Sequence, residues 1–323
     1  MKALLCRENA EDIGTLKLED IALPPLEPHE ARIRVRAAGV NFPDILMVQG
    51  KYQHRPDLPF IVGGECAGDV IAVGGDVTNV TVGDRVVGGT LQGGFAEENQ
   101  LPAAGLRKIP GDAGYAEAAS FTTAYLTAYV ALVRRGELEA GETLLVHGAA
   151  GGVGLAAVDL GKVLGAKVIA TASSEAKRAF LKDYGADLVL PSSGFREAVK
   201  DFTGGKGADV IYDPVGGDVF DESVRCINFN GRLLIIGFTS GRIPTIGVNM
   251  PLIKGFSVVG VRAGEYGRKD PAKGRENIAA IDRLLAEKRI RPHIGAHFPL
   301  TQAVDAMRAL STRTIIGKAV VKP

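Results

Sequence analysis

The stretch Thr143–Gly154, TLLVHGAAGGVG, decides the fold of this chain, together with the apolar-faced run that follows it, Leu155–Leu164. A short strand pattern leads into a glycine-rich turn and then into a helix pattern, which is the context that a dinucleotide-binding loop needs. A pyrophosphate approaches backbone N–H groups at the start of a helix, where side chains would block it. We therefore expect Gly151 to permit close approach of the ligand and Gly154 to permit close packing of helix on strand.

The loop departs at one position from the usual G-x-G-x-x-G pattern, because Ala149 stands where the first glycine is expected. The alternative interpretation is a tight turn between strand and helix that binds no ligand. The candidate cofactor-binding residues of the loop are Ala150, Gly151, Gly152 and Val153.

Strand-like and helix-like segments alternate along the chain after this loop. Short apolar runs predict strands at Val168–Ala172, Leu188–Leu190, Val210–Tyr212, Arg232–Ile236 and Ser257–Val261. Helix-like stretches lie between them at Glu175–Tyr184, Phe195–Phe202 and Val219–Cys226. Alternation with such short links is typical of βαβ units. It predicts a doubly wound parallel sheet over residues 125–264 and favours a ligand-binding loop over a bare turn.

The chain on either side of this region has a different character. Residues 1–124 show short β patterns separated by Pro and Gly turns, which predicts a small barrel or sandwich with one short helix. The expected strands are Met1–Leu5, Glu30–Val35, Gly68–Val73 and Asp84–Val87, and the expected helix is Pro43–Gln49. In residues 265–323 we expect helices at Asn277–Glu287 and Thr301–Leu310, with Thr301 as a candidate cap, and a strand at Gly317–Val321.

Composition and charge exclude several classes of function. The 323 residues, 46% hydrophobic and 23% charged, indicate a globular chain of about two domains. The net charge of +1 and the absence of Trp argue against nucleic acid or an anionic membrane as a partner. No run reaches the roughly 18 apolar residues of a membrane span. The three cysteines are far apart and no targeting pattern opens the sequence, so we expect a cytoplasmic location.

The end of the second strand of the parallel sheet indicates which dinucleotide binds. NAD sites carry an acidic residue about 20 positions after the glycine loop. Here that position is Ser174, in the segment ASSEAKR at 172–178. The hydroxyls of Ser173 and Ser174 and the ammonium of Lys177 suit a 2′-phosphate, which favours NADPH as the cofactor. The alternative is an ordinary serine helix cap followed by a solvated lysine.

Further motifs run along nearly the whole chain. Besides the glycine loop they are AGVNFPD at 38–44, QGKY at 49–52, GGECAG at 63–68, VGDRV at 82–86, LTAY at 126–129, YDPVGG at 212–217 and GK at 317–318. Together they resemble the medium-chain dehydrogenase/reductase superfamily, specifically its zinc-free, zeta-crystallin-like quinone oxidoreductase branch. The resemblance implies an α/β fold: a chaperonin-10-like β-barrel catalytic domain, residues 1–124 and 265–323, interrupted by a Rossmann domain, residues 125–264. It also implies a homodimer.

The positions that hold zinc in the alcohol dehydrogenase branch carry other residue types here. Asn41 stands in place of a cysteine and Gly64 in place of a histidine, and the third ligand would fall near Ala119 or Ser120. A catalytic zinc needs about three N or S protein ligands. We therefore expect no metal site.

Without a metal, hydrogen-bond donors must polarise the carbonyl group of the acceptor. The resemblance points to Asn41 and to Tyr52, in the QGKY turn, as the catalytic residues. The alternatives are a turn-stabilising amide for Asn41 and a packing role for Tyr52. Asp44 and Glu65 are expected as supporting residues.

The resemblance also implies further cofactor contacts. Its candidates are Thr127, Gly237, Phe238, Val261 and Lys318. Thr127 and the residues after the fifth and sixth strands would lie at the nicotinamide end. Lys318 would be a basic residue near the cofactor, with a surface lysine as the equal alternative.

These observations favour an NADPH-dependent oxidoreductase that reduces quinones or activated C=C bonds in enones and enals by hydride transfer without zinc. One alternative is an enoyl-thioester (enoyl-CoA) reductase, because related enoyl reductases share the Gln-Gly-x-Tyr turn. Another is a weakly catalytic NADPH-binding regulatory protein. The expected partner is a small-molecule acceptor.

Overall fold

Two compact units divide the chain. The computed structural model describes residues 1–89 and 91–323. Its contacts group Met1–Thr123 with Pro292–Pro323 as unit 1, and Ala124–Arg291 as unit 2. No helix among the described residues is both long enough and apolar enough to cross a membrane.

The second boundary lies further along the chain than the junction of residues 264 and 265, where we expected it. Helices α8 (Ala263–Lys269) and α9 (Pro271–Ala286) pack on each other and belong to unit 2. Arg134, in the helical turn η3 (Val130–Arg135), donates to Asn277 Oδ1 on α9 over 2.8 Å. The apolar stripe of α9 predicts a helix but does not indicate which unit it covers, so the pattern alone could not place this boundary.

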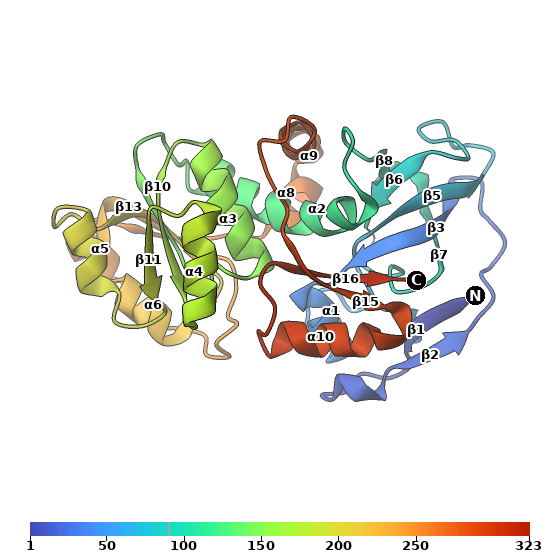
Figure 1. The fold of residues 1–323 in the computed structure, drawn as a ribbon, viewed down its shortest axis with the longest axis horizontal. Helices are drawn as coiled ribbons and strands as arrows, with labels where there is room; N and C mark the ends of the chain where they lie inside the picture. The colour runs from blue at the N-terminus through green and yellow to red at the C-terminus, as the bar shows by residue number, and fades with distance from the viewer. Residues whose placement is uncertain (90) are drawn as a thin grey trace. The chain divides into compact units, whose positions relative to one another are not determined.

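Unit 2 is built on a six-stranded sheet in the order β11-β10-β9-β12-β13-β14. Figure 1 labels β10, β11 and β13 of this sheet. The strands are β9 (Thr143–Val146), β10 (Lys167–Ala172), β11 (Leu188–Pro191), β12 (Ala208–Asp213), β13 (Ile227–Ile235) and β14 (Ser257–Gly260). The strand pairs run parallel, which confirms the predicted doubly wound sheet. The strand order reverses between β9 and β12, and in such sheets ligands bind at that point, outside the carboxyl ends of the strands.

Helices connect these strands, and four of them were predicted: α3 (Gly152–Val163), α4 (Glu175–Tyr184), α5 (Arg196–Phe202) and α6 (Gly217–Ser223). Helix α7 (Asn249–Lys254), before β14, was not predicted. Helix α4 begins after Ser174, whose Oγ accepts from Lys177 N, and ends at Gly185, whose φ of 113° suits glycine alone. Strand β9 is buried along its whole length, as expected for a central strand covered on both faces.

Unit 1 contains a larger sheet with the order β15-β16-β3-β5-β6-β8, in which β7 also pairs with β3. Its strands are β3 (Glu30–Gly39), β5 (Cys66–Val73), β6 (Arg85–Gly88), β7 (Glu98–Pro102), β8 (Leu106–Lys108), β15 (Ile294–Pro299) and β16 (Lys318–Lys322). A smaller sheet pairs β1 (Lys2–Cys6) with β2 (Lys17–Asp20) and β4 (Phe60–Ile61). Strands β2, β4, β7, β8 and β15 were not predicted, because their apolar patterns are short or mixed.

In the part of unit 1 that the structure describes, α1 (Phe42–Val48) and α10 (Ala303–Ser311) join strands, and α2 (Tyr115–Tyr129) leads from β8 into unit 2. The expectation that Thr301 caps α10 is wrong. The N-cap is Gln302, and Thr301 lies in a 3₁₀ turn, Leu300–Gln302, through which the chain enters the helix.

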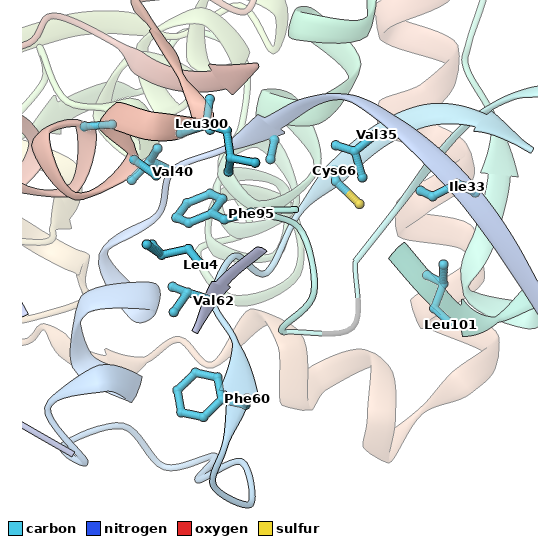
Figure 2. Packing of buried hydrophobic residues seen from close by; sticks show 14 of the residues in the cluster. Leu4, Ile33, Val35, Val40, Phe60, Val62, Cys66, Phe95, Leu101 and Leu300 are labelled. Carbon is cyan, nitrogen blue, oxygen red and sulfur yellow. The ribbon is translucent and has the colours of Figure 1, made fainter. Parts of the chain in front are cut away.

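The core of unit 1 collects apolar side chains from its N-terminal and C-terminal parts (Figure 2). Leu4, Val62 and Phe95 lie together, because backbone hydrogen bonds join each of them to the next. Val40, just after β3, and Leu300, from the C-terminal segment, belong to the same cluster. The segment from Pro292 onward therefore completes a core that the first 123 residues begin.

Candidate functional site

The glycine loop of unit 2 lies between β9 and α3, where the sequence predicted it. Gly151 is the N-cap of α3 and brings no side-chain capping bond. Gly152 and Val153 form the first turn of the helix, and Ala150 is buried just before it. The N–H groups of a first helical turn have no partner within the helix, and the positive end of the helix dipole favours an anion there. The loop therefore fits a phosphate group.

Two glycines of this loop are needed for different reasons. A Cβ atom on Gly154 would lie 2.3 Å from Gly148 O, which confirms the packing role expected of Gly154. A Cβ atom on Gly151 would meet Gly148 O at 3.4 Å, an ordinary contact, and the φ of Gly151 is −84°. Packing within unit 2 therefore does not require a glycine at position 151, whereas the expected close approach of a ligand would.

Two basic side chains follow the carboxyl end of β10, next to the glycine loop. Lys177 lies in the first turn of α4, after the exposed residues Ser173 and Ser174. Arg178 Nη1 donates to Ala172 O over 3.3 Å and to Ser173 O over 3.2 Å. Lys177 was predicted from the sequence and Arg178 was not, although the two are adjacent in the chain. Together with the hydroxyls they form a polar, basic edge at this strand end.

The other cofactor residues predicted in unit 2 follow the remaining strands or lie on α2. Gly237 and Phe238 come after β13, and the Phe238 ring is 39% exposed. Val261 follows β14 and donates its backbone N–H to Ile235 O over 3.0 Å. Thr127 is partly buried on α2. The structure thus places the first three at the carboxyl edge of the sheet, whereas Thr127 comes from a different element.

Asp213, at the carboxyl end of β12, is a residue that the sequence argument did not single out. Its Oδ1 accepts from Val215 N over 2.8 Å and from Gly216 N over 2.9 Å, which shapes the turn after β12. Burial raises the pKa of the Asp213 carboxyl, and the two backbone N–H groups oppose that rise. This turn adjoins the glycine loop, because His147 N donates to Tyr212 O over 3.0 Å.

Unit 1 holds a buried polar cluster, which we call the Asn41 cluster: Asn41, Asp44, Glu65 and Lys318. Asn41 follows β3, Asp44 lies in the first turn of α1, Glu65 precedes β5 and Lys318 opens β16. The strands are neighbours in the order β16-β3-β5, so their pairing brings these residues together. Asp44, Glu65 and Lys318 are buried, and Asn41 is partly exposed.

Lys318 lies at the centre of this cluster. Its Nζ donates to Asn41 Oδ1 over 2.5 Å and to Val40 O over 3.0 Å, and it lies 3.8 Å from Glu65 Oε2. The second oxygen of Glu65, Oε1, accepts from Thr123 N over 3.0 Å. Burial lowers the pKa of Lys318, while the charges of Glu65 and Asp44 oppose that effect. The expectation of a surface lysine is therefore wrong, and its N–H donors point into unit 1.

Asn41 and Asp44 complete the cluster. Asn41 Nδ2 donates to Glu65 Oε2 over 3.2 Å and to Gly39 O over 3.3 Å. Asp44 accepts from the backbone N–H groups of Asn41, over 2.7 Å, and of Gly64, over 3.0 Å. Burial raises the pKa of Asp44 to about 7, although these two bonds act in the opposite direction. The amide of Asn41 is thus held on both sides by charged groups.

Tyr52, the second predicted catalytic residue, lies in the same unit. It is partly buried in the segment that follows α1 and packs against the core cluster of unit 1. These contacts agree with the alternative interpretation of Tyr52 as a packing residue. They do not test its catalytic role.

The residues present do not fit a catalytic zinc. Among residues 1–89 and 91–323, no three His, Cys, Asp or Glu side chains come together in a way that could hold a metal ion. In the Asn41 cluster the amide of Asn41 and the ammonium of Lys318 face the Glu65 carboxylate, and Asp44 accepts from two backbone N–H groups. The cation of this cluster is the side chain of Lys318.

Comparisons with known proteins agree with this architecture. The family model of the alcohol dehydrogenase GroES-like domain matches residues 27–129, and that of the zinc-binding dehydrogenases matches residues 152–281. A quinone oxidoreductase-like protein 2 homolog from Nematostella vectensis is 39% identical over 326 residues, covering 99% of this chain and 88% of the relative.

Two solved structures are similar over 100% of both chains. A mycobacterial protein complexed with NADPH has a TM-score of 0.91 at 32% identity. The quinone oxidoreductase of Escherichia coli, also complexed with NADPH, has a TM-score of 0.90 at 28% identity.

The fold and these matches define an oxidoreductase built from a GroES-like domain and a Rossmann nucleotide-binding domain. More narrowly, the chain belongs to the quinone oxidoreductase branch of the medium-chain dehydrogenase/reductase superfamily. This confirms the resemblance and the fold class that its motifs indicated.

Proposed function

We propose that this chain is an NADPH-dependent reductase of quinones or of activated C=C bonds in enones and enals, and that it acts without zinc. The observation that carries the proposal is the carboxyl edge of β9 and β10. There an uncapped helix start, at a glycine that packing does not require, follows β9, and Lys177 and Arg178, in the first turn of α4, follow the neighbouring strand β10. That arrangement suits a dinucleotide with one extra phosphate.

The proposed cofactor contacts follow the carboxyl edge of the sheet. Residues 150–153 hold the pyrophosphate through backbone N–H groups, and Ser173, Ser174 and Lys177 hold the 2′-phosphate. The nicotinamide end is assigned to Thr127, Gly237, Phe238 and Val261. When bound, NADPH supplies a hydride from its nicotinamide ring. The structures of the two NADPH-bound relatives support this choice of cofactor.

The acceptor gains one hydride and one proton, so a quinone becomes a hydroquinone and an enone becomes the saturated ketone. Negative charge develops on the acceptor oxygen before the proton arrives, and fixed hydrogen-bond donors stabilise it. We assign this role to Asn41 and Tyr52 in unit 1. The hydrogen bonds of Asn41 Nδ2, at 3.2 and 3.3 Å, are long, so an acceptor oxygen can compete for one of its hydrogens.

We propose that unit 2 also forms a homodimer. Val248, Leu252 and Ile253, which we call the α7 patch, are 87%, 82% and 75% exposed. They precede β14, the strand at the edge of the sheet, whose N–H and C=O groups can pair with another strand. An apolar patch beside an open strand edge fits a second copy of this chain, because two such edges can pair about a two-fold axis.

A cytoplasmic location is kept as part of the proposal. Cys6, Cys66 and Cys226 are buried free thiols, a state that a reducing compartment maintains.

The first experiment is NADPH oxidation by the purified protein, with NADH in parallel and with a small quinone, a 2-alkenal and a crotonyl thioester as acceptors. The proposal expects turnover with NADPH and the quinone or the alkenal. Turnover with the thioester alone would instead identify an enoyl-thioester reductase. Saturable NADPH binding without turnover would indicate the weakly catalytic regulatory protein.

A further inference from the structure

Lys318 carries its ammonium group into the interior of unit 1, where its side chain is 8% exposed. An ammonium has three N–H donors and no acceptor. Asn41 Oδ1 and Val40 O accept two of them, at 2.5 and 3.0 Å, and Glu65 Oε2, 3.8 Å away, is the ion-pair partner of the ammonium. A cofactor phosphate would therefore compete with these groups for Lys318.

The ammonium determines which way the amide of Asn41 points. Lys318 can only donate, so it must face Oδ1, and Nδ2 must then face Glu65 and Gly39. The flipped amide would set its NH₂ group against the ammonium and its oxygen against the Glu65 carboxylate and the Gly39 carbonyl. Both of those contacts repel, because each pairs donors with donors or acceptors with acceptors. Lys318 and Glu65 together thus exclude the flipped form.

We propose that Lys318 is a positioning residue for acceptor reduction, which holds the amide of Asn41 in one orientation through its bond to Oδ1, and is not a cofactor contact. This inference rests on the proposed function, in which Asn41 Nδ2 donates to the acceptor oxygen.

The environment of Lys318 strengthens this effect. Its ammonium is buried, and a charge in the interior acts through a lower dielectric than a charge in water. It draws electron density toward Oδ1 and thereby makes the N–H groups of Asn41 better donors. Asn41 is partly exposed, whereas Lys318, which holds its amide, is buried. A donor fixed in advance does not have to reorient when charge develops on the acceptor.

The test compares Lys318→Met with Lys322→Met. Methionine keeps the length of the side chain and removes the charge, and Lys322 is an exposed lysine at the other end of the same strand. We measure the dissociation constant of NADPH by fluorescence titration, and turnover with the quinone by NADPH oxidation. For Lys318→Met we expect turnover to fall on the order of 10- to 100-fold while NADPH affinity is unchanged. For Lys322→Met we expect neither to change.

A double-mutant cycle with Asn41→Ala tests whether Lys318 acts through Asn41. In the Asn41→Ala background, Lys318→Met should have little further effect on turnover, because the amide that it orients is gone. Additive losses, unchanged turnover in Lys318→Met, or a weaker NADPH affinity that matches the loss of turnover would each overturn the inference.

Two further arms keep the inference testable if Lys318→Met does not fold, since Glu65 would then be buried without its partner. The combined variant Lys318→Met with Glu65→Gln removes both charges, and it should still show reduced turnover with normal NADPH affinity. In Lys318→Ala, added propylammonium should restore turnover, whereas the neutral propanol should not. Restoration by both would show that Lys318 only fills space.

The outcomes distinguish the inference from the function on which it rests. A wild-type protein that is inactive with every acceptor would refute the proposed function and this inference with it. An active wild type whose turnover is matched by Lys318→Met would refute the inference alone.

Discussion

The ammonium of Lys318 donates a hydrogen bond to Asn41 Oδ1 over 2.5 Å, although 277 residues separate the two along the chain. The contact exists because β16 pairs antiparallel with β3, through Val320 opposite Gly39. The residues proposed to act on the acceptor are therefore assembled within unit 1 alone. Those proposed to hold NADPH belong to unit 2. Each set can be tested by its own variants.

The glycine loop offers a matched pair of substitutions. Gly154→Ala should lower the free energy of unfolding by about 1–3 kcal/mol or prevent folding, because its Cβ would lie 2.3 Å from Gly148 O. Gly151→Ala should leave the melting temperature nearly unchanged and weaken NADPH binding, because its methyl group would make only an ordinary contact with Gly148 O, at 3.4 Å, but would obstruct the ligand. Thermal unfolding and NADPH titration measure the two effects. Wild-type NADPH affinity in Gly151→Ala would contradict the proposed role of this glycine.

The preference for NADPH over NADH should depend on Lys177 and Arg178. Hydrogen bonds to charged groups contribute about 1.5–3 kcal/mol, so Lys177→Ala should reduce the ratio of the two affinities on the order of 10-fold or more. Arg178→Ala should act in the same direction. Lys182→Ala, an exposed lysine further along α4, is the control and should change nothing. If Lys177→Ala keeps the wild-type ratio, the assignment of the 2′-phosphate to Lys177 fails.

The sequence predicted the parallel sheet and the glycine loop of unit 2 well, for a physical reason. Strands that are buried on both faces appear as continuous apolar runs, as TLLV of β9 does, and the turn after β9 needs glycine at position 154 whatever else changes. Strand β7 of unit 1 escaped prediction because one of its two buried residues is the polar Asn99, and β8 because it has only three residues, of which Leu106 alone is apolar.

The environment of Lys318 could not be predicted either. In KAVVK the lysine looks like the exposed end of a strand, and only the pairing of β16 with β3 shows that it is buried. The motif positions of Asn41, Asp44 and Glu65 were visible in the sequence, but their hydrogen bonds depend on contacts between distant segments. Arg178 could have been found from the sequence, because it is adjacent to Lys177 at the start of the helix that follows the predicted strand Val168–Ala172.

Tyr52→Phe tests the proposed donor of unit 1 directly. If the Tyr52 hydroxyl gives the proton to the reduced acceptor, turnover with an enone should fall by roughly 10²- to 10⁴-fold, the usual contribution of a general acid. Tyr115→Phe removes a hydroxyl that bonds to Asp69 and should affect stability but not turnover. Unchanged turnover in Tyr52→Phe would leave Tyr52 as a packing residue.

The burial of His147 should make the free energy of unfolding depend on pH in the acid range. Burial lowers its pKa from 6.5 to about 3 in the folded protein, where it bonds to Thr171 Oγ1 and Ser223 Oγ. Between these values the unfolded chain binds the proton and the folded protein does not. The contribution of His147 to stability is therefore full above pH 6.5 and is lost as the pH falls toward 3, by up to about 1.4 kcal/mol per pH unit. His147→Gln should flatten the dependence of the melting temperature on pH in that window, and an unchanged slope would contradict this account.

The proposed homodimer should dissociate when charge is placed on the α7 patch. Leu252→Glu combined with Val248→Lys should give a monomer in light scattering after size exclusion, while the wild type gives a dimer, because burying either charge at an interface is costly. Val82→Lys is the control, since Val82 is an exposed valine of unit 1, 62% accessible and outside the patch. A monomeric wild type, or a dimer that survives the double substitution, would contradict the proposed interface.

The most direct test of the central claim is a single turnover with NADPH deuterated at both hydrogens of nicotinamide C4 and with a 2-alkenal as acceptor. Mass spectrometry of the saturated product shows where the label goes. The account predicts one deuterium bound to carbon in the product, and a slower reaction than with unlabelled NADPH. A product without deuterium, or no oxidation of NADPH above the rate in buffer with the alkenal or with a small quinone, would contradict it.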